Sequence, residues 1–175
     1  MQQFENKVKE DLHKYLLSIG EVDDRLPETS DLEDKWPAIG EAYLADGIKE
    51  FRTYPIASLG WMMYIGMAVA KYWDDDWTLY GNVENLYLFL RDKSGYDLMD
   101  EYIRGPLLGL RQPEFDDTET MVQTCANHAH SLLIHAHLEP GTEAAFRGYV
   151  ACLHQLYLMG AAVQLKRMGY KMCKL

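Results

Sequence analysis

Two stretches of eighteen residues without a formal charge, Thr53–Ala70 and Gly148–Leu165, constrain the fold more than any other feature. A helix that is apolar on every side has to be buried. The length is borderline for crossing a membrane. However, the second stretch contains His154, Gln155 and Gln164, and polar groups are costly in lipid. We therefore expect two central helices in the core of a soluble protein, and no membrane insertion.

Both stretches contain a short segment rich in small residues. These segments read "IGMAVAK" at 65–71 and "MGAAVQLK" at 159–166. Small side chains allow two helix backbones to approach closely. We therefore expect the two central helices to cross at these segments.

Helical spacing of apolar residues extends over almost the whole chain, and no alternating strand pattern interrupts it. Pro37 and Pro55 are placed to begin helices, and Asn82 and Thr142 are placed to cap them. Gly20 is placed to end the first helix. The expected helices span residues 4–19, 37–51, 55–73, 82–90, 97–104, 114–138 and 143–172. The prediction is an all-α fold, a bundle of six or seven helices forming one domain over residues 1–175.

The charge of the chain is strongly negative, with a formal net charge of −10. An acidic surface repels phosphate backbones, which argues against a nucleic-acid partner and favours a basic one. The three cysteines are widely spaced and odd in number, so a disulfide framework is not expected. The first residues are charged and contain no apolar signal-peptide core. We therefore expect a cytoplasmic protein.

The segment "NHAHSLLIHAH" (127–137) places four histidines on one predicted helix. His128 and His135 fall on one side, and His130 and His137 fall on nearly the opposite side. Within each pair the residues are about 10.5 Å apart along the helix axis. One metal ion needs ligands at about 2 Å, so neither pair closes a site. The expectation is a structural segment with no metal and no cofactor.

Arg147 and His154 form an R-x6-H spacing on the last predicted helix. This spacing resembles the RNA-cleaving motif of the HEPN family, which has an all-α fold. The resemblance implies that Arg147 and His154 would act on RNA. Gly148 follows the arginine, where the family usually has a polar residue, and the acidic net charge opposes an RNA substrate.

The stretch "KYWDDDWTLYGN" (71–82) surrounds three adjacent aspartates with aromatic side chains. We expect the third helix to end here, where mutual repulsion and the helix dipole would both disfavour the carboxylates. A basic neighbour, a bound cation or a cationic partner would offset this. If no basic residue of the chain approaches the aspartates, an external cationic partner is the better explanation, and neutralising them would raise stability while weakening partner binding. The candidate binding residues are Trp73, Asp74, Asp75, Asp76 and Trp77.

The leading hypothesis is a non-catalytic acidic helical protein that binds a basic partner protein, for example as an immunity or antitoxin-like protein. The alternative is an enzyme or small-ligand-binding bundle with a pocket near His154. In that alternative, His154 would be the ligand-contacting group within an apolar helix. We expect this histidine to be buried and within reach of a polar group.

Overall fold

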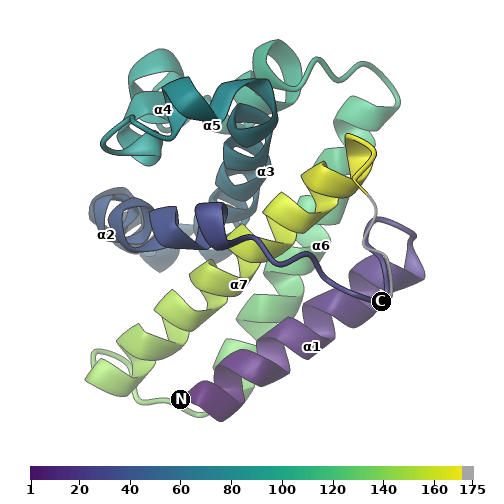
Figure 1. The fold of residues 1–175 in the computed structure, drawn as a ribbon. Helices are drawn as coiled ribbons and strands as arrows, with labels where there is room; N and C mark the ends of the chain where they lie inside the picture. The colour runs from purple at the N-terminus through teal and green to yellow at the C-terminus, as the bar shows by residue number, and fades with distance from the viewer. Residues whose placement is uncertain (171–175) are drawn as a thin grey trace.

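The computed structural model describes residues 1–170 as a bundle of seven α-helices and one π-helical turn, with no strand in that range (Figure 1). The helices are α1 (Gln2–Ser18), α2 (Ser30–Thr53), α3 (Pro55–Tyr80), α4 (Leu86–Ser94), α5 (Met99–Tyr102), α6 (Glu114–His135) and α7 (Glu143–Arg167), and the π-helical turn is η1 (Ile103–Leu107). The all-α prediction and the number of helices are confirmed.

The two apolar helices, α3 and α7, are central and cross in direct backbone contact (Figure 1). A Cβ atom at Gly66 would lie 2.1 Å from the carbonyl oxygen of Tyr157, and one at Gly160 would lie 2.1 Å from that of Met63. No side chain fits at either position. The expected crossing of the two small-residue segments is therefore confirmed.

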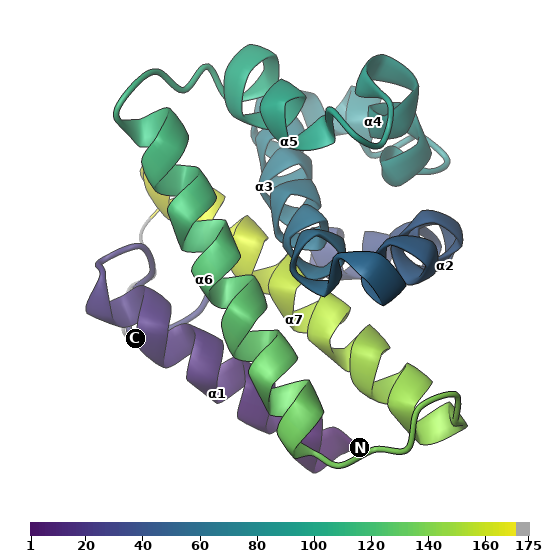
Figure 2. The same cartoon turned by 180° about the vertical axis from the view of Figure 1, so that it is seen from behind.

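Helix α1 covers α6 and α7 on one side of the bundle, as both ribbon views show (Figures 1 and 2). Val8, Leu12 and Leu16 recur at helical spacing and are fully buried. The helix ends at Ser18, and Gly20 follows with a φ of 76°. Glycine adopts this left-handed conformation at little cost, so Gly20 stops the helix as expected.

Helix α2 begins at Ser30, seven residues before the predicted start at Pro37. Proline inside a helix removes one hydrogen bond, which is why the pattern favoured a start at Pro37. Packing reverses that preference, because the first turns bury Leu32 and place Trp36 against α7. The loop expected up to residue 36 is therefore partly helical.

The caps are predicted correctly at one helix and displaced at another. The Thr142 hydroxyl accepts a hydrogen bond from the Ala145 N–H at 3.2 Å, so it caps α7 as expected. Asn85 caps α4 in place of Asn82 and accepts from the Leu88 N–H at 3.1 Å. Its amide also donates to the carbonyl of Ala38 at 2.9 Å, which ties α4 to α2.

Two helices end earlier than predicted. Helix α6 stops at His135, and His137 beyond it has a φ of 54°. Helix α7 stops at Arg167, and Gly169 follows with a φ of 94°. The predicted end at Met172 lies outside the described residues. Within residues 1–170, none of the helices combines the length and apolar character that a membrane crossing requires.

Candidate functional site

The acidic stretch at residues 73–77 contains a break in α3. Helical structure continues to Tyr80, interrupted at Asp76, which has an extended conformation (φ −167°, ψ 87°). The Asp76 carboxylate accepts a hydrogen bond from the Leu79 N–H at 3.2 Å. Asp76 therefore caps the start of a new helical turn, where negative charge is favourable. The helix that begins at Pro55 therefore ends within the acidic stretch, as expected, with Asp74 and Asp75 in its last turn. Asp76 itself lies at the favourable start of the following turn.

The other two aspartates also have partners within the chain. Asp74 accepts a hydrogen bond from the Tyr170 hydroxyl at 2.6 Å, and this bond raises the pKa of Tyr170. Asp75 pairs with Lys71 at 2.6 Å. Each of the three carboxylates thus has a partner within the chain, and the partner of Asp75, Lys71, is a basic neighbour of the kind expected from the sequence.

The two tryptophans of the stretch face different neighbours. The Trp73 indole N–H donates to Asp31 at 3.0 Å, and Trp73 lines a cavity of about 150 Å³ with Asp31 and Tyr170. Lys35 lies over the Trp77 ring at 5.6 Å. Whether these residues bind a partner stays a prediction.

His154 lies between two carboxylates from different helices. One ring nitrogen, Nε2, is 3.0 Å from Glu33 Oε1, and the other, Nδ1, is 3.3 Å from Glu5 Oε1. The ring stacks on Trp36 with centroids 4.9 Å apart. Its side chain is 17% exposed, so it is partly buried and has the expected polar partners. His154 therefore joins α1, α2 and α7.

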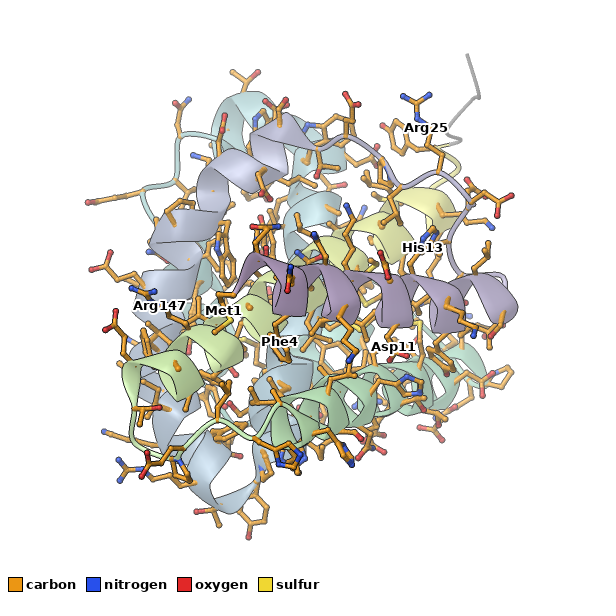
Figure 3. All side chains as sticks on the ribbon, turned by 90° about the horizontal axis from the view of Figure 1, so that it is seen from below. Met1, Phe4, Asp11, His13, Arg25 and Arg147 are labelled. Carbon is orange, nitrogen blue, oxygen red and sulfur yellow. The ribbon has the colours of Figure 1, made fainter. Side chains whose placement is uncertain are left out.

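The pocket nearest to His154 in sequence terms does not have this histidine in its lining, so the expected contact of His154 with a pocket is not seen there. A pocket of about 330 Å³ is lined by Glu33, Gln155 and Lys9, and His154 is not among its lining residues. Arg147, the other half of the R-x6-H spacing, has a 63% exposed side chain and pairs with Glu143 at 2.5 Å (Figure 3). The two carboxylates on His154 would repel an RNA phosphate.

The histidines of 127–137 point to separate partners. His128 Nδ1 is 2.7 Å from Asp11 Oδ2, and Figure 3 labels Asp11 on α1. His130 lies edge-on to Phe51, and His135 bonds the backbone of its own helix. Among residues 1–170, no group of three or more His, Cys, Asp or Glu side chains is arranged to hold a metal ion.

A buried arginine, which the sequence reasoning missed, organises a polar cluster between α3, α5 and α6. Arg104 lies in the π-helical turn and its side chain is 3% exposed. It reaches Asp100 Oδ2 and Glu119 Oε2, each at 3.3 Å, and donates to the carbonyl of Phe115 at 3.1 Å. Its guanidinium lies 5.6 Å from the centre of the Tyr64 ring. The only sequence signal was the i, i+4 spacing of Asp100 and Arg104.

Burial dominates the electrostatics of this cluster. It raises the pKa of Asp100, while the Glu101 backbone N–H and Arg104 act in the opposite direction. Burial also raises the pKa of Tyr64, which stays a neutral phenol. An ion cluster in a π-helical turn is notable because such turns often occur at functional sites.

A second feature that the sequence reasoning missed is a broad groove between α2 and α4, which lie side by side in both ribbon views (Figures 1 and 2). The groove has a volume of about 740 Å³. Its apolar lining residues are Ala38, Ala42, Ala45, Val83, Leu88 and Phe89. Glu41, Glu84 and Asp92 complete the lining with Asn85, and none of these three acids has an ion-pair partner among residues 1–170.

Comparison of the chain with protein-family models, with curated proteins and with solved structures finds no match. The seven α-helices, with no strand among residues 1–170, define the class as an all-α helical bundle.

Proposed function

We propose that the protein is a non-catalytic acidic bundle that binds a basic, amphipathic helix of a partner protein in the α2–α4 groove. The observation that carries the proposal is an apolar floor bordered by three unpaired carboxylates, with no basic residue in the lining. A groove between two helices is a common binding site for the apolar face of a third helix.

The apolar residues that line the groove are suited to contact an apolar stripe on the partner helix. Ala38, Ala42 and Ala45 recur at i, i+4 and i+7 and leave a shallow trough along α2. Leu88 is 37% exposed on the α4 side, beside Phe89. Covering this apolar surface would contribute about 25 cal/mol for each Å² removed from water.

The rim favours a basic occupant. Glu41, Glu84 and Asp92 come from both sides of the groove. Lys93 lies 4.7 Å from the centre of the Phe89 ring but does not line the groove. The net charge of −10 would steer a basic partner toward the protein.

The described cysteines support a role without nucleophilic catalysis. Cys125 and Cys152 are fully buried, and burial raises the pKa of each thiol to about 12. They therefore remain thiols, which are poor nucleophiles. Cys173 lies outside the described residues. An immunity or antitoxin-like role in the cytoplasm would be one form of this proposal.

The test compares two triple variants of equal net charge. The groove variant carries Glu41→Gln, Glu84→Gln and Asp92→Asn. The control carries Glu10→Gln, Glu101→Gln and Glu139→Gln, which neutralise exposed acids outside the groove. The probe is a synthetic amphipathic helix with a leucine stripe and a lysine face, and calorimetry measures its affinity.

We expect the groove variant to lose about tenfold or more in affinity and the control to bind as the unmodified protein does. Amide exchange should be slowed in residues 38–45 and 83–92 on binding. Equal losses in both variants would mean that the peptide responds to net charge alone, and the proposal would be wrong.

A further inference from the structure

A pocket between α3, α5 and α6 carries an inference that is independent of the α2–α4 groove, because the two share no lining residue. The pocket has a volume of about 390 Å³, within the range of small-ligand sites. Its lining includes Tyr54, Trp61, Tyr64, Asp100 and Glu119. The three elements can be followed in Figure 2.

Two of the carboxylates that line the pocket are held in place by an arginine that does not line it. Arg104 takes one oxygen of Asp100 and one of Glu119, and it does not line the pocket itself. One guanidinium between two carboxylates leaves a formal charge of one negative unit on the cluster. The Asp100 side chain is 16% exposed and the Glu119 side chain is 43% exposed, so water screens the charge less at Asp100 than at Glu119. The wall therefore favours a cation.

The hydroxyl of Tyr64 is a buried polar group that the described part of the chain leaves without a partner. Tyr64 lines the pocket and is 2% exposed. Its hydroxyl oxygen has no hydrogen-bond partner within residues 1–170. A buried polar group without a partner costs about 1–3 kcal/mol. A ligand N–H would supply the hydrogen bond that the protein does not.

Two aromatic rings add a surface for a cation. The Trp61 indole N–H donates to the carbonyl of Tyr96 at 2.8 Å, which fixes the ring. The rings of Trp61 and Tyr64 are nearly perpendicular, at 86°, with centroids 6.2 Å apart. Tyr54 is 62% exposed and also lines the pocket. Such rings attract ammonium groups, and tryptophan attracts them most strongly.

We propose that this pocket binds the protonated primary amine of a small molecule. Asp100 and Glu119 supply the negative charge, Trp61 and Tyr64 supply the aromatic faces, and the Tyr64 hydroxyl accepts one ammonium N–H. A divalent metal would need about six oxygen ligands, which two carboxylates already shared with Arg104 do not provide. An anionic ligand would be repelled.

The experiment titrates the full chain with three probes of similar size and follows amide signals by NMR. The probes are n-butylammonium, tetramethylammonium and n-butanol. We expect n-butylammonium to bind most tightly, because tetramethylammonium has no N–H and n-butanol has no charge. Nα-acetyl-lysine amide is a fourth probe for a lysine side chain as the source of the amine. Its binding as tightly as n-butylammonium would overturn the assignment to a free small molecule.

Two variants separate the charge from the hydroxyl. Glu119→Gln should weaken binding of both ammonium ions by about tenfold. Tyr64→Phe should weaken the binding of n-butylammonium and leave the affinity for tetramethylammonium unchanged, because only the hydroxyl is removed. The matched control is Glu139→Gln, an exposed acid outside the pocket, which should change neither affinity.

Thermal melting of the variants without ligand checks that they are folded. Tyr64→Phe should not lower the melting temperature, since the hydroxyl it removes has no partner. The proposal is overturned if n-butanol binds as tightly as n-butylammonium, if no ammonium ion binds, or if Glu119→Gln leaves the affinities unchanged.

Discussion

At the residue scale, His154 combines three interactions that a leucine would not reproduce. It reaches Glu5 and Glu33 through its two ring nitrogens and stacks on Trp36. When the imidazole is protonated, both contacts are ion pairs. The sequence reasoning singled out this residue because it interrupts an apolar helix, and the partners that explain it come from distant positions in the chain.

We expect His154→Leu to lower the free energy of unfolding by about 1 kcal/mol, because two carboxylates lose a hydrogen-bond partner. The Glu33 side chain is 47% exposed, which limits the cost. Urea denaturation measures the change. His135→Leu, on an exposed histidine, is the control and should stay within about 0.5 kcal/mol. Equal effects would contradict the role assigned to His154.

His130 predicts a dependence of stability on pH. Burial lowers the pKa of this imidazole. The unfolded chain therefore takes up the proton first as the pH falls. The contribution of His130 is fully present above the ordinary histidine pKa of about 6.5 and is lost as the pH falls through the lowered pKa. Thermal melting of the unmodified protein and of His130→Asn between about pH 7 and about pH 5 should show a smaller loss in the variant. An equal loss of melting temperature in the unmodified protein and in the variant would rule out this contribution of His130.

At the element scale, the crossing of α3 and α7 tolerates no Cβ atom. We expect Gly66→Ala and Gly160→Ala each to lower the free energy of unfolding by about 3 kcal/mol, because the new carbon would overlap a carbonyl oxygen of the other helix. Gly105→Ala is a matched control, since the nearest atom to its Cβ is 3.9 Å away. Chemical denaturation of all three variants checks the difference. A loss at Gly105 as large as that at Gly66 would contradict the crossing.

The interruption at Asp76 predicts a cap. Asp76→Ala should cost about 1 kcal/mol, because the Leu79 N–H loses its acceptor. Asp76→Asn keeps an acceptor and should cost less. The earlier expectation, that neutralising the three aspartates raises stability, is replaced by its opposite. Melting temperatures of the two variants distinguish these outcomes, and a stabilised Asp76→Ala would restore the repulsion argument.

The helical spacing of apolar residues and the residues at helix ends predicted most of the fold. The apolar spacing located all seven helices, and Thr142 and Gly20 marked real ends because capping depends on neighbours in the chain. The start of α2 before Pro37 was missed because tertiary packing of its first turns overrides a local preference. The Arg104 cluster and the α2–α4 groove depend on contacts between separate helices, which no local pattern encodes.

At the scale of the whole molecule, the net charge of −10 should act on association rates. Raising the salt concentration from about 50 mM to about 500 mM should slow association of the basic helix with the protein. Dissociation should change less, because apolar contacts in the groove are not screened. Stopped-flow fluorescence measures both rates. An association rate that does not depend on the salt concentration would show that charge plays no part in the encounter of the two molecules.

The close approach of α3 and α7 at Gly66 and Gly160 has a consequence for synthesis of the chain. The surface that α3 buries against α7 finds its partner only after residues near 160 have left the ribosome. Until then, the eighteen uncharged residues Thr53–Ala70 lack their main covering helix. Nascent chains with exposed apolar surface are prone to aggregate and are bound by chaperones. A ribosome-bound chain that ends before α7 should therefore depend on a chaperone, and one that includes α7 should not.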